Sequence, residues 1–181
     1  VSYNHIDDLL ADESIELVVV NTPNFTHFDY AAKALQANKH VLIEKPVVTT
    51  VAAFEQLQKI AEQSGKQIFA YQNRRWSSDI MAAREVVQSG ILGTIIEMHL
   101  RFDRYRPTIG PKLFKETPVP GSGIWYDLGS HLIDQAISIF GTSCNFYSYK
   151  NKYRDGAQVP DFGFMHLVFD QTNVFITTSM L

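Results

Sequence analysis

HVLIEKP, residues 40–46, is a short apolar run that ends in a charged pair and a proline. Consecutive Val, Leu and Ile are typical of a buried β-strand, and Pro46 ends it because proline has no N–H for the ladder. Similar runs lie on either side, LVVVN at residues 17–21 and QIFAY at residues 67–71. We therefore expect three strands at 17–21, 40–44 and 67–71.

The segments between these strands carry helical patterns. Apolar residues recur at helical spacing as Phe28, Ala31, Ala32 and Leu35 in the first segment and as Phe54, Leu57, Ile60 and Ala61 in the second. Asn38 and Gly65 are available to end these two helices. Strands that alternate with single helices predict right-handed βαβ units on a parallel sheet, so this part is expected to be a doubly wound α/β structure.

The pattern changes after Tyr71. A helix is expected at 79–88, and residues 96–103 alternate between apolar and polar, which indicates a half-buried strand. A loop at 104–123 then leads to a helix at 124–140, and further strands are expected near 144–150, 162–169 and 174–180. We therefore predict a partial Rossmann domain at 1–75 and a partial α+β domain with a mostly antiparallel sheet at 76–181.

The composition excludes several classes of protein. The chain has 181 residues, and its 45% hydrophobic content is enough for a sizeable core. Its 16 basic and 19 acidic residues form no long like-charged run, so we expect small-molecule partners rather than nucleic acid. Its apolar runs are far shorter than the roughly 20 residues that cross a membrane. The single cysteine, Cys144, excludes an internal disulfide, and the cytoplasm is the expected compartment.

Polar segments follow all three strands of the first domain, at residues 21–24, 44–46 and 72–75. Ligands of parallel α/β sheets bind beyond the carboxyl ends of the strands. Ordinary turn chemistry explains any one segment, but three together favour a binding site. Lys45 stands out because Pro46 restricts its backbone to extended conformations and allows a cis bond. The alternative for Lys45 is a solvated surface lysine.

The expected helix at 124–140 is apolar around most of its circumference. A single polar line crosses it, formed by Asp127, His131, Asp134 and Ser138. Buried polar groups need partners, so this line faces a ligand or is satisfied within the fold as an Asp–His pair. A third alternative is a metal site with Asp127, His131 and Asp134 as ligands, which no cysteine or second histidine at suitable spacing supports.

These motifs together resemble the Gfo/Idh/MocA family of nicotinamide-dependent sugar and inositol dehydrogenases. The residues that carry the resemblance are Asn21-Thr22-Pro23-Asn24 with His27, Glu44-Lys45-Pro46, Asn73-Arg74-Arg75-Trp76, and Asp127-Leu-Gly129-Ser-His131. Residues 102–107 and 121–129 look most like a bacterial branch of the family that contains scyllo-inositol dehydrogenases.

The resemblance implies roles for individual residues. The catalytic residues would be Lys45, Asp127 and His131. Contacts with the NAD or NADP cofactor would come from Asn21, Thr22, Pro23, Asn24, His27, Glu44, Lys45, Asn73 and Arg75. Contacts with a sugar or polyol substrate would come from Lys45, Arg104, Arg106, Tyr126, Asp127 and His131. No metal site is expected, and the open sheet of the second domain is expected to form a homo-oligomer.

One departure from the family pattern bears on activity. The chain contains no G-x-G-x-x-G phosphate turn, and Gly121-Ser-Gly123 follows a proline-rich loop rather than a strand. We therefore expect a piece of a longer enzyme, truncated at both ends and inactive by itself. The alternative is a non-enzymatic relative that keeps the fold for binding and regulation.

Overall fold

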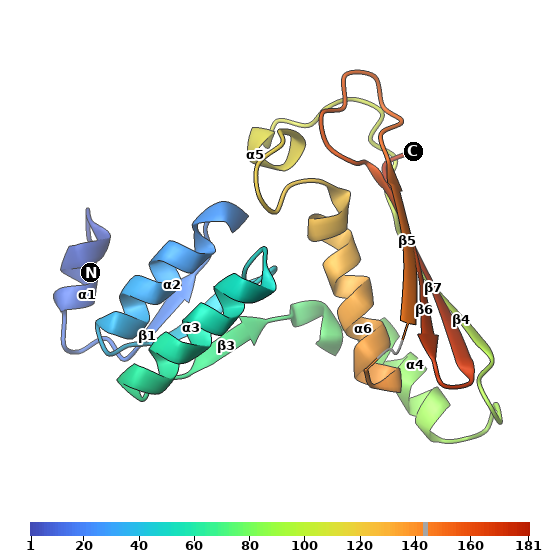
Figure 1. Cartoon of the computed structure of the whole chain (residues 1–181), viewed down its shortest axis with the longest axis horizontal. Helices are drawn as coiled ribbons and strands as arrows, with labels where there is room; N and C mark the ends of the chain where they lie inside the picture. The colour runs from blue at the N-terminus through green and yellow to red at the C-terminus, as the bar shows by residue number, and fades with distance from the viewer. Residues whose placement is uncertain (143–144) are drawn as a thin grey trace. The chain divides into compact units, whose positions relative to one another are not determined.

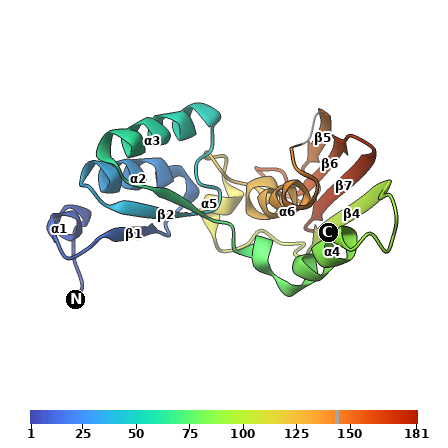
Figure 2. The same cartoon turned by 90° about the horizontal axis from the view of Figure 1, so that it is seen from below.

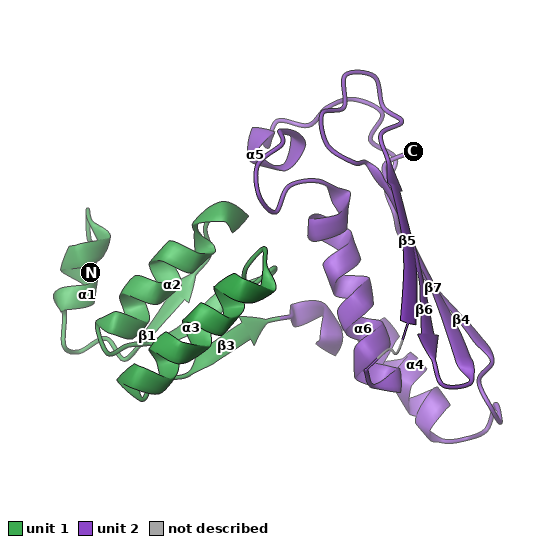
Figure 3. Ribbon diagram, in the orientation of Figure 1, with its two compact units in different colours: residues 1–71 green, residues 72–181 purple. Residues whose placement is uncertain are grey.

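The computed structural model describes residues 1–142 and 145–181 and forms two compact units, residues 1–71 and 72–181 (Figure 3). The division precedes the boundary expected near residue 75 because the 3₁₀ turn η2 (Asn73–Trp76) packs inside the second unit. The side-chain amide of Gln135, for example, donates to the carbonyl oxygen of Arg74 at 3.1 Å.

The first unit is a three-stranded parallel sheet, as the sequence predicts. Its strands lie in the order β1-β2-β3 and are joined by one helix each. Their bounds are β1 Leu17–Val20, β2 His40–Glu44 and β3 Ile68–Tyr71, with α1 Ile6–Ala11, α2 His27–Gln36 and α3 Val51–Ser64. Thr50 caps α3 by accepting a hydrogen bond from the amide of Ala53, and Gly65 ends it with a φ of 63°.

The two connecting helices of this unit lie on the same face of the sheet (Figure 2). Right-handed crossovers between strands taken in sequential order place both helices on one side. Val18, Val20, Val41 and Ile43 form the core beneath them. A doubly wound sheet, as expected from the sequence, has helices on both of its faces. Within the described residues, α2 and α3 cover one face of this sheet.

The opposite face of this sheet carries an apolar stripe. Val19, Leu42 and Phe69 are in register across the three strands. Val19 is 58% exposed and Phe69 is 43% exposed, so the stripe faces solvent rather than a core.

The second unit has a four-stranded sheet with the order β4-β7-β6-β5. Two of its three pairings are antiparallel and the pairing of β4 with β7 is parallel, as expected for a mostly antiparallel sheet. The bounds are α4 Ser78–Gln88, β4 Glu97–Asp103, α5 Leu113–Glu116, a π-helical turn η3 at Trp125–Gly129, α6 Ser130–Phe140, β5 Asn145–Asn151, β6 Phe162–Phe169 and β7 Thr172–Ser179. Residue 144 of the expected strand 144–150 lies outside the described residues. No helix in the described part of the chain is long and apolar enough to cross a membrane.

Helices α4 and α6 pack against one face of this sheet (Figure 1). The opposite face carries a row of rings, His99, Phe175, His166 and Tyr147, in register across β4, β7, β6 and β5. The ring centroids of His99 and His166 lie 5.0 and 4.6 Å from that of Phe175. This sheet therefore has one face buried by helices and one aromatic face without a helix among the described residues.

The helix expected at 124–140 begins differently from the prediction. Residues 125–129 form the π-helical turn, and the α-helix starts only at Ser130. The ring of Trp125 lies so close to Gly129 that a Cβ added there would meet Cδ2 at 2.9 Å, and a Cβ on Gly163 would be closer still. Both positions thus require glycine for the indole to fit between η3 and β6.

Candidate active site

The loops after β1 and β2 are joined by one buried histidine. His27, the first residue of α2, is completely buried. Its Nδ1 lies 2.8 Å from the carbonyl oxygen of Pro46, and its Nε2 lies 2.9 Å from that of Thr22. A neutral imidazole donates to one of these oxygens, whereas the protonated ring donates to both. The side chain predicted to contact a cofactor therefore lies inside the unit, where it fixes the two loops.

The loop after β1 is further ordered by hydroxyl groups. The Oγ1 atom of Thr26 lies 2.8 Å from that of Thr22 and 2.7 Å from the carbonyl oxygen of Pro23. Asn21 and Thr22 are exposed, whereas Pro23 and Asn24 are half-buried. The polar groups expected at the carboxyl end of β1 are thus held in a fixed turn and partly accessible to a ligand.

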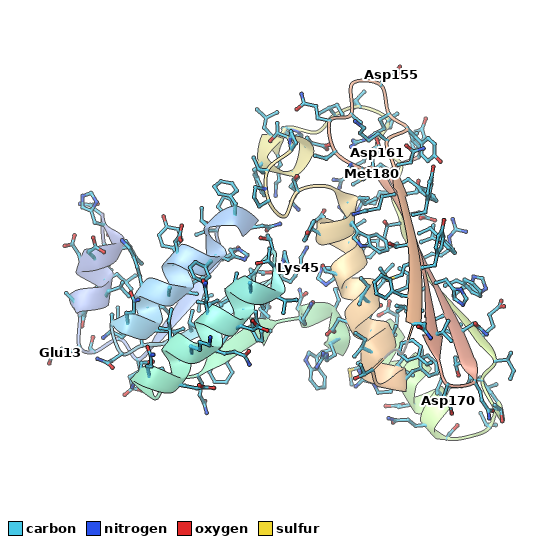
Figure 4. The ribbon with its side chains drawn as sticks, viewed as in Figure 1. Glu13, Lys45, Asp155, Asp161, Asp170 and Met180 are labelled. Carbon is cyan, nitrogen blue, oxygen red and sulfur yellow. The ribbon has the colours of Figure 1, made fainter. Side chains whose placement is uncertain are left out.

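Lys45 directly follows β2 and is labelled in Figure 4. The Lys45–Pro46 peptide bond is cis. Glu44 turns back on its own strand end, since its Oε2 accepts a hydrogen bond of 3.1 Å from the amide of Lys45. The lysine is half-buried rather than fully solvated, which weakens the surface-lysine alternative.

The cofactor-binding residues expected after β3 lie in the second unit. Arg75 makes a bidentate ion pair with Asp134 of α6, with Nε 3.0 Å from Oδ2 and Nη2 also bonded to Oδ1. The hydrogen bond to Asp134 raises the pKa of Arg75. Asp134 therefore anchors η2 to α6, and the guanidinium of Arg75 is engaged within the protein. Asn73, at the start of the same turn, is exposed.

Asp127 lies in η3 and faces two cations. Its Oδ1 accepts a hydrogen bond of 2.6 Å from Nζ of Lys115, and its Oδ2 lies 4.0 Å from Nη1 of Arg104. The carboxylate is only 14% exposed, so these cations offset the cost of its burial. Lys115 comes from α5, a short helix in the segment expected to be a loop, and the sequence pattern does not reveal it.

The other members of the predicted polar line are buried or bonded to a neighbouring helix. His131, the second residue of α6, is 7% exposed. Ser138 accepts a hydrogen bond of 2.9 Å from Nη2 of Arg84 in α4. Residues 1–142 and 145–181 contain no group of three His, Cys, Asp or Glu side chains placed to hold a metal ion. The metal alternative for Asp127, His131 and Asp134 therefore has no support in this geometry.

A pocket of about 280 Å³ opens beside Asp127 in the second unit. Three of the predicted substrate-binding residues, Arg104, Arg106 and Asp127, line it, whereas Tyr126 and His131 are not among its lining residues. The other lining residues are Gly110, Pro111, Lys112, Lys115, Glu116, Gly123, Ile124, Arg154, Val159, Pro160 and Met180. Lys45, the remaining predicted substrate-binding residue, belongs to the first unit.

A buried arginine builds the wall of this pocket. Arg154 is 6% exposed and bonds to Asp161, labelled in Figure 4, at 3.0 Å and to Glu116 at 2.7 Å. Its Nη1 also donates to the carbonyl oxygen of Thr108 at 3.2 Å. These bonds to Glu116 and Asp161 outweigh the effect of burial and raise the pKa of Arg154. One guanidinium thus ties the segment after β5 to the segment after β4, a connection that no sequence pattern predicts.

Comparison with known families gives matches over almost the whole chain. Residues 1–72 match the model of the oxidoreductase family with an NAD-binding Rossmann fold, GFO/IDH/MocA. Residues 80–181 match the model of the GFO/IDH/MocA C-terminal domain. The first match ends at residue 72, next to the division of the structure between Tyr71 and Gln72.

Individual relatives match both units. An uncharacterised oxidoreductase of Schizosaccharomyces pombe is 44% identical over 87% of this chain and 42% of its own length. The scyllo-inositol 2-dehydrogenase (NADP⁺) of Bacillus subtilis is 32% identical over 92% of this chain and 46% of its own. The crystal structure of an oxidoreductase from Bacillus cereus superposes with a TM-score of 0.85 and 33% identity, covering 98% of this chain and 50% of that one. The chain spans about half the length of the curated relatives it matches.

Proposed function

From the premise that the chain belongs to the GFO/IDH/MocA oxidoreductase family, we propose that the whole protein oxidises a secondary alcohol of a sugar or inositol-like polyol. The sugar and inositol part of this proposal draws on the scyllo-inositol 2-dehydrogenase among the relatives. The family supports an oxidoreductase, and the proposed hydride acceptor is NAD or NADP.

In the proposed reaction, residues of this chain remove the proton of the substrate hydroxyl and stabilise the negative charge that develops on its oxygen. His131 takes the proton of the substrate hydroxyl as general base, a task suited to imidazole near neutral pH. Lys45 donates a hydrogen bond to the same oxygen and stabilises the negative charge that develops on it. Asp127 orients the substrate or the imidazole and is itself held by Lys115.

The nicotinamide ring of NAD or NADP, when bound, supplies the acceptor for the hydride. The turn after β1 and the Glu44-Lys45 segment after β2 fit such a ligand, because neutral and charged donors and acceptors meet at the carboxyl edge of a parallel sheet. In this proposal His27 serves the site indirectly, since its ring holds both loops from inside the unit.

The observation that carries the proposal is the placement of Asp127. Its carboxylate lies at a pocket lined by cations and is held by Lys115, while His131 follows one turn later on the same helical segment. A carboxylate and an imidazole placed in this way provide an orienting group and a base for an alcohol substrate.

Turnover of the whole protein tests this assignment. We expect Lys45→Met and His131→Ala each to lower kcat for oxidation of scyllo-inositol or a related polyol, by about a hundredfold or more. Lys66→Met, which removes a lysine just beyond the C-terminal end of α3, is the matched control and should leave kcat unchanged. Wild-type turnover in the Lys45 and His131 variants would contradict the assignment.

We also propose that the aromatic face of the second unit associates with a second copy of the chain. Tyr147 is 61% exposed, and it shares a row of rings with His166, Phe175 and His99. Aromatic side chains are enriched at protein interfaces, and the face has no helix over it in the part of the chain that the structure describes.

A further inference from the structure

We infer that the substrate of the pocket beside Asp127 carries an anionic group, a carboxylate or a phosphate, in addition to its alcohol. This inference rests on the proposed function, because it names the class of substrate for the same site. The wall of this pocket carries an excess of positive charge, which a neutral polyol does not require.

The pocket wall is rich in cations. Its five basic side chains are Arg104, Arg106, Lys112, Lys115 and Arg154, and its two acidic side chains are Glu116 and Asp127. Asp161 lies just behind the wall as a further partner of Arg154. Five cations against three carboxylates leave two positive charges in excess.

The ion pairs show which cations supply this excess. Arg154 is shared between the buried carboxylate of Asp161 and the half-buried carboxylate of Glu116, and Lys115 and Arg104 both face Asp127. Arg106 and Lys112 form no salt bridge with any residue that the structure describes. Both side chains are exposed and line the pocket, so they are available to an incoming anion.

The backbone holds Arg106 in a defined position at the pocket. Its amide donates to the carbonyl oxygen of Met180 at 2.8 Å, continuing the pairing of β4 with β7, and its own carbonyl accepts from Arg154 at 3.4 Å. An arginine held in this way can bind a carboxylate or a phosphate through two parallel N–H···O bonds. An anion bound by Arg106 and Lys112 would leave the rest of a small polyol within the pocket that Asp127 lines.

Three sugars with the same glucose ring and different groups at carbon 6 test the inference. Their binding to the full 181-residue chain is measured by isothermal titration calorimetry at low salt. D-glucose is neutral, D-glucuronate carries a carboxylate and D-glucose 6-phosphate carries a phosphate at the same carbon. We expect at least one anionic sugar to bind about tenfold more tightly than glucose, with an affinity that falls as salt is added. Tighter binding of glucuronate would identify a carboxylate and tighter binding of glucose 6-phosphate a phosphate, and either result supports the inference.

Variants at the two pocket cations test whether these side chains cause the preference for an anionic sugar. Arg106→Gln and Lys112→Gln should each reduce the preference, and the double variant should abolish it. Arg101→Gln, which removes an exposed arginine of β4 outside the pocket wall, is the control and should retain it. Equal binding of all three sugars, no measurable binding of either anion, or a preference that survives in the double variant would each overturn the inference.

The two proposals fail separately. Lys45-dependent oxidation of neutral and anionic polyols with equal kcat/KM by the whole protein would defeat the anionic-substrate inference alone. Binding of the anionic sugar without nicotinamide-dependent oxidation of any polyol would defeat the proposed function and leave the anion site standing.

Discussion

At the scale of single residues, Asp127 depends on a partner from another part of the chain. Lys115 donates to its Oδ1 at 2.6 Å, and only 14% of the carboxylate side chain is exposed. Charge-assisted hydrogen bonds of this kind are short and hold their partners in one orientation. Lys115 is therefore a positioning residue for Asp127 in the proposed reaction.

Lys115→Met should lower kcat/KM of the whole protein by about tenfold to a hundredfold, because the substitution removes one charge-assisted hydrogen bond from Asp127. Lys115→Arg should restore part of the loss, since a cation is kept. Steady-state kinetics on these variants measures the effect, with Lys150→Met in the exposed strand β5 as control. Equal kcat/KM in Lys115→Met and wild type would show that Asp127 does not need this lysine.

Gly163→Ala should destabilise the protein by about 1–3 kcal/mol, because the added Cβ would overlap the ring of Trp125. Gly110→Ala is the matched control, since its Cβ would meet only the end of the Glu116 side chain at 3.5 Å. Denaturant unfolding followed by circular dichroism measures both. Combining Gly163→Ala with Trp125→Leu should recover part of the loss, and no recovery would contradict this steric explanation.

At the scale of elements, Arg154 connects two segments that are far apart in the sequence. It bonds to Glu116 of α5 and to Asp161 at the start of the β6 segment. Both ion pairs are largely shielded from water, with 2% of the arginine side chain exposed. Removing one member of such a buried network leaves uncompensated charge inside the protein.

Arg154→Met should therefore lower the free energy of unfolding by about 3–5 kcal/mol. Arg101→Met, which breaks the exposed pair with Asp103, should change it by less than about 0.5 kcal/mol. Urea unfolding of the two variants side by side measures the contrast. Similar small effects in both would mean that the pocket wall does not depend on Arg154.

The end of α1 provides a prediction about pH. Asp12 accepts hydrogen bonds from the hydroxyl and amide of Ser14 and from the hydroxyl of Tyr3, and these hold its pKa at about 2, below the ordinary 3.8. A lowered pKa means that this contribution to stability is fully present above about pH 4 and is lost as the pH falls toward 2. Titration of the carboxyl carbon by NMR should show the low value, and Ser14→Ala should raise it. A wild-type pKa near 3.8 would contradict these bonds.

Strands were more predictable from the sequence than the contacts that build the site. Short apolar runs predict β1 to β3, and alternation of apolar and polar residues predicts β4. Burial of a strand on both faces or on one face leaves these patterns in the local sequence. The π-helical turn at 125–129 was not predictable, because it depends on Trp125 packing against Gly163, which lies in a distant strand. The same reason applies to Lys115 and Arg154, whose partners are set by tertiary structure. The polar line from Asp127 to Ser138 was visible because its members share one helical segment.

At the scale of the whole molecule, the proposed association through the aromatic face predicts a change of mass. Tyr147→Lys should weaken self-association of the whole protein at least tenfold, because it places an ammonium group among stacked rings at the interface. Tyr105→Lys replaces a tyrosine that is 81% exposed outside the sheet and should have no effect. Light scattering coupled to size exclusion measures both. Unchanged mass for Tyr147→Lys across a dilution series would exclude this face as the interface.

The stripe of Val19, Leu42 and Phe69 on the first unit also has a practical consequence. Side-by-side apolar groups on a flat, solvent-facing sheet attract hydrophobic dyes and other apolar surfaces. The isolated chain should therefore bind such a dye while fully folded, and its colloidal stability should improve with low concentrations of mild detergent. Dye fluorescence alone is thus an unsafe indicator of unfolding for this chain, and thermal melts are better followed by circular dichroism.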